Sequence, residues 1–300
     1  MNHSVTGPPL PAGPSLPVGP PLPAGLPPLP EPLPSPVADG HAHFDLARSG
    51  EDPLDVETVL KAAAAVNVTR AVQIGCDLDS ARRTLDAVQR YPALLGGVAL
   101  HPTQASRFSA GSPALHAAFA ELEELASHPR IRVIGETGLD HHWVTDPAGR
   151  AAAEESFRLH IELAKRTDRV LQIHDRDAHE DVLRVLKDQG APARTVFHCF
   201  SGDAEMARTC VDNGWYLSFA GNITFKNAHS LRAALAEVPL RLLSVETDAP
   251  YLTPTPHRGK VNASYLVPHT VRTMAQVLGL DLEAVCAGLD ATFEDLYGPW

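Results

Sequence analysis

The feature that most constrains the fold of this 300-residue chain is an alternation of short apolar runs and longer amphipathic stretches after residue 36. Strand-like runs occur at 37–44, 70–76, 94–100, 132–136, 170–174, 195–200, 215–220 and 242–246. Helix-like stretches occur at 54–66, 80–91, 113–127, 151–166, 178–189, 204–213, 228–237, 264–278 and 282–296. Strands separated by helices indicate parallel βαβ units. We therefore predict an α/β fold, a (β/α)8 barrel of the TIM type. A doubly wound open sheet is the alternative, because the number of strands does not prove closure.

The first 36 residues have a different composition. They hold 14 of the 27 prolines and a single charged side chain, Glu31. Proline fixes φ and removes a backbone donor, so this stretch is predicted to be a disordered or polyproline II tail that does not pack. Residues 37–300 are predicted to form the one folded domain. A role for the tail as a ligand of an SH3-like partner is the lesser alternative, because its Pro-x-x-Pro spacing is weak.

Charge, cysteine content and hydropathy limit the environment and the partners. The net charge of −11 is unusual for a protein that binds nucleic acid through a broad cationic face, so any such substrate must be held locally. The four cysteines are scattered without a Cys-x-x-Cys pair, which predicts reduced, mostly buried thiols. The absence of a secretory signal and of an apolar run of about 18 residues predicts a cytoplasmic protein without a membrane span. We infer no obligate protein partner.

Residue types that bind metals gather at the ends of the predicted strands. They are His41 and His43 on the first, Glu136 on the fourth, His174 on the fifth, His198 on the sixth, and Asp248 just after the eighth. In a (β/α)8 barrel these ends meet at one rim, where active sites form. Side chains two residues apart on a strand point the same way, so His41 and His43 are able to hold one ion together.

Each of these residues alone has an ordinary structural explanation. A single histidine is commonly a hydrogen-bonded core residue, Glu136 is able to cap a helix, and Asp248 is able to serve in a turn. Six such placements together favour a metal site. Four histidines and two carboxylates suit two divalent ions (Mg, Mn or Zn), with Glu136 as the shared ligand. Such a site keeps a residual positive charge, which suits a phosphate.

Seven ordered motifs resemble those of the TatD family of metal-dependent deoxyribonucleases. They are Asp-x-His-x-His at 39–43, His-Pro at 101–102, Gly-Glu-x-Gly-Leu-Asp at 135–140, His-x-Arg-Asp-Ala at 174–178, His-Cys-Phe-Ser-Gly at 198–202, Ser-x-x-Gly-x-Ile-Thr-Phe-Lys-Asn at 218–227 and Glu-Thr-Asp-Ala-Pro-Tyr-Leu-Thr-Pro at 246–254. The resemblance covers residues 38 to 297. Two departures affect substrate preference: Val-Asn-Ala-Ser at 261–264 replaces the family's Arg-Asn-Glu-Pro, and Asp175 replaces a small residue.

The resemblance implies a (β/α)8 barrel, a divalent metal site and a hydrolase with 3′ to 5′ exonuclease action on DNA. It also implies one ion on His41, His43, Glu136 and Asp248, and a second on Glu136, His174 and His198.

From the residues themselves we expect Asp248 to be the base that orients and deprotonates the attacking water, with Glu136 as the second catalytic residue. Candidates for substrate binding are His101, Arg176, Lys226 and Arg258, together with Lys260. Asp140 and Glu246 are expected to support the site from behind.

The expected partner is DNA with single-stranded 3′ ends. The enzymatic alternative is an amidohydrolase or phosphotriesterase that acts on a small ester, amide or lactone. The non-enzymatic alternative is a binding or scaffold protein that uses the proline tail and a relict barrel.

Overall fold

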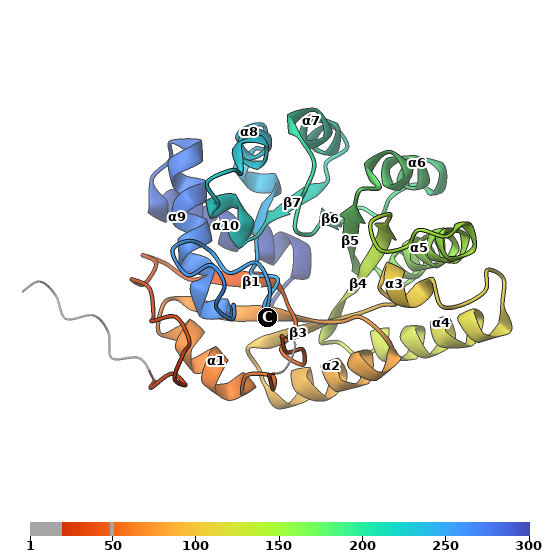
Figure 1. The fold of residues 1–300 in the computed structure, drawn as a ribbon, viewed down its shortest axis with the longest axis horizontal. Helices are drawn as coiled ribbons and strands as arrows, with labels where there is room; N and C mark the ends of the chain where they lie inside the picture. Colours follow the sequence, from red (N-terminus) through yellow and green to blue (C-terminus); the bar gives the residue numbers. More distant parts are fainter. Residues whose placement is uncertain (1–19, 49–50) are drawn as a thin grey trace, which may run out of the picture.

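The computed structural model describes residues 20–48 and 51–300, and its centre is an eight-stranded parallel sheet in the order β1 to β8 (Figure 1). The strands are β1 (Val37–Ala42), β2 (Val68–Gly75), β3 (Leu94–Val98), β4 (Ile131–Asp140), β5 (Val170–Arg176), β6 (Thr195–Phe197), β7 (Tyr216–Phe219) and β8 (Leu243–Val245). Each strand pairs in parallel with the next one along the chain. The (β/α)8 prediction is confirmed, and the sequential strand order is not that of a doubly wound sheet.

The barrel closes between β1 and the segment that follows β8. The Asp248 N–H donates to the His41 carbonyl at 2.9 Å, and the His43 N–H donates to the Ala249 carbonyl at 2.8 Å. The carboxylate of Asp39 accepts hydrogen bonds from the backbone N–H and the hydroxyl of Thr247 at 2.8 and 2.6 Å. Burial raises the pKa of Asp39 to about 6. The first and last strands are therefore joined at the end of the barrel that carries His41 and Asp248.

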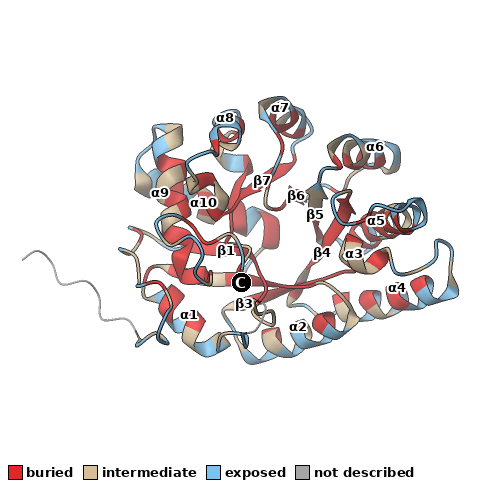
Figure 2. Cartoon of the chain, in the orientation of Figure 1, coloured by how far each residue is buried: buried red, intermediate tan, exposed pale blue. Residues whose placement is uncertain are grey.

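Helices cover the outside of the barrel. They are α1 (Val56–Ala64), α2 (Leu78–Arg90), α3 (Pro102–Ala105), α4 (Pro113–Ala126), α5 (Pro147–Thr167), α6 (His179–Gln189), α7 (Ala204–Asp212), α8 (His229–Ala236), α9 (Val267–Leu278) and α10 (Leu282–Tyr297), with 3-10 turns η1 (Gly221–Thr224), η2 (Leu240–Leu242) and η3 (Ser264–Leu266). Figure 2 shows buried strands inside helices that expose one face. The pattern follows from the sequence, because the strands are apolar on both sides and the helices on one.

The ends of the helices follow from local chemistry. The Asp77 side chain accepts from the Ser80 N–H, and the Ser80 hydroxyl accepts from the Asp77 N–H, which makes a capping box for α2. Asp146 caps α5 and is followed by Pro147, whose missing N–H costs nothing in the first turn. Gly279 ends α9 at φ 64°, where a side chain would be strained. The sequence did not predict α3, η1 or η2, and it placed the η3 residues 264–266 at the start of the helix-like stretch 264–278.

The prediction for the N-terminal stretch is wrong for its second half. Leu33 is buried, and its N–H donates to the Val66 carbonyl while its own carbonyl accepts from the Asn67 side chain. Arg272 donates to the carbonyls of Glu31 and Pro32. Proline lacks a donor but keeps a carbonyl, so an extended proline-rich segment is still able to bind groups on the barrel surface. Residues 20–36 therefore belong to the folded unit, and residues 1–19 of the predicted tail lie outside the described part.

Candidate metal centre

Six predicted ligands converge at the carboxyl end of the barrel. They lie on or just after five strands: His41 and His43 at β1, Glu136 on β4, His174 on β5, His198 after β6, and Asp248 after β8. All except Asp248 and His174 are buried in the chain, and these two are only partly exposed. Five of the six, all except His41, line a cleft of about 860 Å³. The structure thus brings together every residue that the sequence assigned to a metal.

The two oxygens of Glu136 face two different groups of imidazoles. Oε2 lies 3.6 Å from Nε2 of His41 and 3.7 Å from Nε2 of His43. Oε1 lies 2.6 Å from Nδ1 of His174 and 2.8 Å from Nε2 of His198. Oδ1 of Asp248 lies 3.9 and 3.6 Å from Nε2 of His41 and His43, and Asp248 also forms a group with His41 and His198 whose geometry suits an ion. One carboxylate thus lies between two clusters of nitrogen and oxygen donors.

Hydrogen bonds behind the rings orient His41 and His43. Nδ1 of His41 lies 2.9 Å from the amide oxygen of Gln172, and Nδ1 of His43 lies 2.9 Å from the Ile74 carbonyl. Both partners are acceptors, so the protons are assigned to Nδ1. In the neutral form that metal ligation requires, each ring presents a bare Nε2, and the two Nε2 atoms are 3.2 Å apart. Facing lone pairs at this distance repel unless a cation is shared, so the donor set fits a divalent ion.

The other two histidines have carboxylates behind them. Nδ1 of His198 lies 3.1 Å from Oε1 of Glu246, and Nε2 of His174 lies 3.0 Å from Oδ2 of Asp140. Such partners select the tautomer and the ring orientation of metal-binding histidines and raise their basicity. Asp140 and Glu246 therefore stand where the sequence expected supporting residues.

The electrostatics of the cluster keep its carboxylates ionised. Burial would raise the pKa of Glu136, but the charge of His198 and the hydrogen bonds from His101 and His174 outweigh it and hold that pKa well below the ordinary value. Burial and the neighbouring His198 lower the pKa of His41. Burial opposes protonation of His174, yet hydrogen bonds to Asp140 and Glu136 raise its pKa to about 9. Buried ionised carboxylates without a lysine or arginine partner attract cations strongly.

His101 joins the cluster on the Oε1 side of Glu136. It directly precedes α3, and its Nε2 lies 3.5 Å from Oε1 of Glu136. Glu136, His174 and His101 form one of the three groups of side chains whose geometry suits an ion. The tautomer of His101 differs from that of His41, because Nδ1 of His101 accepts from the Thr103 N–H at 3.2 Å. In the neutral ring the proton is therefore on Nε2, which points to the cluster as a donor.

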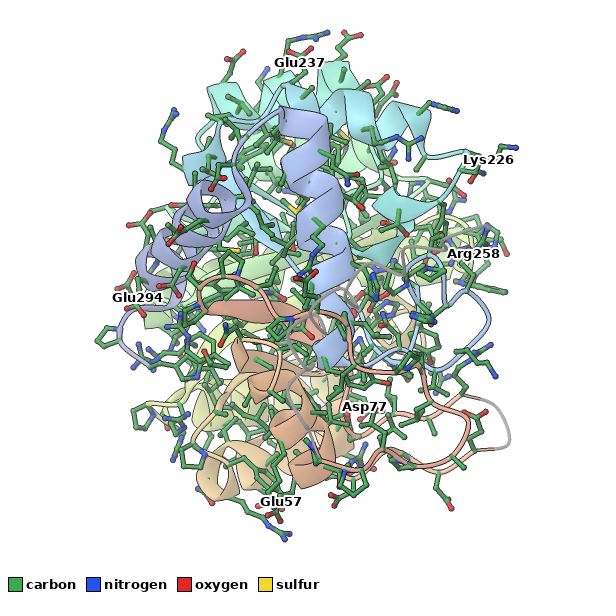
Figure 3. The ribbon with its side chains drawn as sticks, turned by 90° about the vertical axis from the view of Figure 1, so that its left-hand side faces the viewer. Glu57, Asp77, Lys226, Glu237, Arg258 and Glu294 are labelled. Atoms are coloured by element: carbon green, nitrogen blue, oxygen red, sulfur yellow. The ribbon has the colours of Figure 1, made fainter. Side chains whose placement is uncertain are left out.

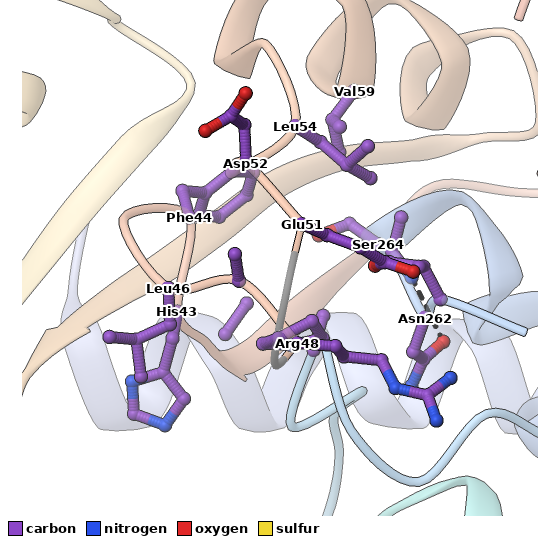
Figure 4. A pocket seen from close by; sticks show the side chains of 16 residues that line it. His43, Phe44, Leu46, Arg48, Glu51, Asp52, Leu54, Val59, Asn262 and Ser264 are labelled. Atoms are coloured by element: carbon purple, nitrogen blue, oxygen red, sulfur yellow. Dashed lines mark hydrogen bonds between the residues drawn. The ribbon is translucent and has the colours of Figure 1, made fainter. Parts of the chain in front are cut away.

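A much smaller cavity of about 30 Å³ lies beside the cluster (Figure 4). His43 and Leu46 contribute to both hollows, while Phe44, Leu54 and Val59 give the small one an apolar wall. A cavity of this size holds one or two water molecules at most, so the large cleft is the place for a substrate.

The family model described as TatD related DNase matches residues 38–298. The chain belongs to the TatD-related DNase family. It is 44% identical over 265 residues to the metal-dependent hydrolase TatD of Mycobacterium tuberculosis, covering 87% of this chain and 98% of the relative. It is 36% identical over 250 residues to the metal-dependent hydrolase YabD of Bacillus subtilis, covering 83% and 94%. This TatD-family protein is therefore a metal-dependent hydrolase.

Solved structures share the fold of this TatD-family chain. The TatD homologue YjjV of Escherichia coli superposes with a TM-score of 0.79 at 24% identity, covering 88% of this chain and 98% of the homologue. The phosphotriesterase homology protein of Escherichia coli has a TM-score of 0.64 at 15% identity, covering 88% and 99%. The fold is common to both, so it does not separate a nuclease from a hydrolase of small esters.

The TatD-family structure separates the cations that the sequence assigned to substrate binding. Arg176 lines the cleft and lies over the Trp143 ring, with 5.7 Å from guanidinium carbon to ring centroid. Lys226, Arg258 and Lys260 are exposed and do not line the cleft. Arg258 stacks on Phe225 at 4.0 Å, and Figure 3 shows Lys226 and Arg258 toward the same edge of the molecule. Among the described residues, Arg176 is the one arginine or lysine that lines the cleft.

Several cleft residues were not assigned a role from the sequence. They are Cys76, Gln104, Trp143, Cys199, Asn222 and Tyr251 in the cleft lining, and Gln172 behind His41. The sequence does hold a signal for Gln172, because it lies two residues before His174 on the same strand and its side chain points the same way. Trp143 and Tyr251 follow the fourth and eighth strands, and residues after the carboxyl ends of barrel strands are expected near an active site. The four cysteines are free, as the sequence predicted.

None of the helices in the described ranges, 20–48 and 51–300, has the length and apolar character needed to cross a membrane.

Proposed function

We propose that this protein hydrolyses phosphodiester bonds of DNA, from the 3′ end of a single strand, with two divalent ions at the carboxyl end of the barrel. The observation that carries this proposal is the position of Glu136, whose Oε1 lies 2.6–2.8 Å from nitrogens of His174 and His198 and whose Oε2 lies 3.6–3.7 Å from nitrogens of His41 and His43. A bridging carboxylate is the hallmark of paired-ion hydrolases of phosphate esters. The family description supports DNA as the polymer.

The ligands divide between the two ions as the oxygens of Glu136 do. His41, His43, Glu136 and Asp248 would hold one ion, and Glu136, His174 and His198 the other. When bound, the pair supplies Lewis acidity that polarises the phosphoryl group, activates water and neutralises charge on the leaving oxygen. The candidates remain Mg, Mn and Zn, and a set rich in imidazole favours Mn or Zn.

Asp248 acts as the base in this proposal. Burial opposes its ionisation, but the hydrogen bond to His43 and the charge of His198 lower its pKa. Its side chain is 16% exposed and lines the cleft, so a water molecule in the cleft is able to reach it. The backbone N–H of Asp248 donates to the His41 carbonyl, which fixes the carboxylate beside the β1 histidines. Asp248 thus orients the water and accepts its proton.

His101 acts as a donor to the substrate. Because its Nδ1 accepts from the Thr103 N–H, the proton of the neutral ring is on Nε2, which lies 3.5 Å from Oε1 of Glu136 at the cleft. Burial lowers the pKa of His101, so the neutral ring is the stable form at pH 7. A donor at this position is able to hold a phosphoryl oxygen or protonate the leaving oxygen. We assign His101 to the substrate and Arg176 to an adjacent phosphate.

The shape and charge of the cleft favour a strand end over a duplex. The chain carries a net charge of −11, so the rigid body of a duplex would meet an acidic surface around the barrel. A flexible single strand is able to bring one terminal phosphate to the floor of the cleft.

The rival function is hydrolysis of a small ester, amide or lactone. Enzymes of that kind often bridge their ions with a modified lysine from the fourth strand. Here β4 offers Glu136, and the described lining of the cleft contains no lysine.

The test is a substrate survey on protein loaded in turn with Mg, Mn and Zn. Linear single-stranded DNA, labelled at either end, should be shortened from the 3′ end, and closed circular single strands and small lactones should be cut far more slowly. Equal rates on circular and linear DNA would exclude action at ends. Faster turnover of lactones or amides than of any oligonucleotide would favour the rival.

A further inference from the structure

Two large aromatic side chains stand exposed at the cleft. Trp143 is 64% exposed and Tyr251 is 45% exposed, and both line the cleft. Leu280 is the other large apolar residue that is exposed in the described ranges. Two of the three large apolar side chains that are exposed in the described ranges therefore stand at the same cleft.

The backbone at Trp143 is anchored to the metal centre. The Trp143 N–H donates to Oδ1 of Asp140 at 2.8 Å, while Oδ2 of the same carboxylate faces Nε2 of His174. Arg150 donates to the carbonyl of Val144, the next residue. The Trp143 ring has the His142 ring edge-on at 4.8 Å between centroids. The backbone that carries the indole is therefore tied to Asp140, while the Trp143 residue stays 64% exposed.

Tyr251 has a corresponding anchor on another part of the rim. Its N–H donates to the Asp248 carbonyl at 2.9 Å, and its own carbonyl accepts from the buried side chain of Asn262 at 2.6 Å. Trp143 follows β4 and Tyr251 follows β8, which stand four strands apart in a ring of eight. The two rings thus rise from opposite sides of the rim, each three residues beyond a carboxylate of the site (Asp140 and Asp248).

The protein side chains that line the cleft offer little positive charge to attract a nucleic acid. Arg176 is the one cation that lines the described cleft, and Asp175 stands beside it. Nucleobases have flat faces, and stacking of one base on an aromatic side chain contributes about 1–3 kcal/mol whatever the base. Arg176 already stacks against Trp143, which places a phosphate-binding group next to a base-binding surface.

From these contacts we propose that Trp143 and Tyr251 are stacking platforms for the unpaired bases that flank the phosphate at the metal centre. The proposal deepens the proposed nuclease function and rests on it. It supplies a reason for selecting single strands, since paired bases in a duplex hide their faces. It also predicts tolerance of base identity, because every base has a face to stack.

The experiment compares two oligodeoxynucleotides on metal-loaded protein: one with bases at its last four positions, and one with abasic residues there. On the normal strand Trp143→Ala should raise KM about 5-fold or more and change kcat less, in line with the loss of one stacked base. Trp143→Phe should restore most of the affinity. Wild type should already bind the abasic strand weakly, and Trp143→Ala should raise KM for that strand little further. Tyr251→Ala and Tyr251→Phe form the matching pair, and Leu280→Ala is the control.

A binding measurement uses the indole itself. Trp215 is buried and Trp300 is partly covered, so quenching of fluorescence by a phosphorothioate oligonucleotide should report mainly on Trp143. Quenching should require bases and disappear in Trp143→Ala. Equal cleavage and equal binding of normal and abasic strands by wild type would overturn the stacking proposal while leaving the nuclease intact. Cleavage of a small phosphodiester, bis(p-nitrophenyl) phosphate, without binding or cleavage of either strand would overturn both.

Discussion

Tyr297, the last residue of α10, accepts a hydrogen bond at its hydroxyl from Nε2 of Gln172 on β5 at 2.9 Å. The same amide nitrogen donates to the Gly40 carbonyl, so the amide oxygen is left to face Nδ1 of His41. A residue on the C-terminal helix thereby fixes the orientation of a candidate metal ligand on the first strand.

This relationship predicts an effect of Gln172 on metal affinity. Gln172→Met keeps the size of the side chain but removes the acceptor behind His41, so affinity should fall about 10- to 100-fold. Tyr297→Phe should cause a smaller loss and should add nothing in the Gln172→Met background, because both act through one amide. Competition with a chromophoric chelator measures the affinity. Gln189→Met, on the outer surface, is the control, and equal losses in it would contradict the assignment.

Glu136→Gln tests the shared carboxylate. The amide keeps the shape but removes the charge between the two histidine groups, so metal content should fall below one ion per chain and activity should nearly vanish. Metal analysis by mass spectrometry and a single-turnover assay give the two readouts. Glu57→Gln on α1, which is exposed, should behave as wild type. Two retained ions with most of the activity would show that Glu136 is not the bridge.

His160 makes the stability of the fold sensitive to acid. Its ring is fully buried on α5, Nε2 accepts from the Leu100 N–H at 3.1 Å, and burial lowers its pKa from 6.5 to about 3. Between pH 6.5 and about 3, the His160 ring is therefore protonated in the unfolded chain but stays neutral in the folded chain. The neutral His160 ring makes its full contribution to the free energy of unfolding above pH 6.5. As the pH falls toward 3 this contribution decreases, by about 2 kcal/mol at pH 5.

Urea unfolding at pH 7, 6 and 5 measures this dependence. His160→Gln should be less stable than wild type at pH 7, and the difference should narrow as the pH falls, because the variant lacks the titrating ring. His116→Gln, at an exposed position on α4, should keep the wild-type slope. Parallel curves for wild type and His160→Gln would contradict the prediction.

The N-terminal segment should stabilise the barrel. A chain that starts at residue 37 loses the buried Leu33 and the hydrogen bond from the Tyr265 hydroxyl to the Pro27 carbonyl. Burial of one leucine is worth roughly 1.5–3 kcal/mol, so the melting temperature should fall by several degrees. A chain that starts at residue 20 keeps all of these contacts and is the matched comparison. Equal melting temperatures would mean that residues 20–36 do not stabilise the barrel.

The position of Arg176 predicts a shallow salt dependence of DNA binding. If it neutralises one phosphate, Arg176→Ala should reduce the log–log slope for a single strand by about 0.7. Arg258→Ala should leave the slope near that of wild type, since its guanidinium stacks on Phe225 outside the cleft lining. Fluorescence anisotropy with a phosphorothioate oligonucleotide, over a range of salt, measures both. An equal reduction of the slope in Arg258→Ala would show that Arg258 also contacts a phosphate.

Local sequence patterns predicted the fold and the ligand cluster, because both depend on residues that are close together in the sequence. His41, His174 and His198 end strands whose apolar character is evident, and parallel strand ends converge whatever the helices between them do. Contacts between distant segments follow no such rule. Gln172 and Tyr297 meet across 125 residues, and Leu33 pairs with Val66 and Asn67 by its backbone alone. The directions of the loop cations follow no such rule either, since loop position does not determine which way Arg258 turns, and their part in substrate binding stays a prediction.

The seam between β1 and β8 has a consequence for biosynthesis. The bonds from Asp248 and His43 that join the first strand to the last also bring Asp248 beside His41, so ring closure and completion of the ligand set happen together. During translation the histidines of β1 leave the ribosome some 200 residues before Asp248 does. Before its last strand arrives, a nascent chain therefore has three of the four ligands proposed for one ion and all three proposed for the other, and Asp248, the proposed base, is the last to join them.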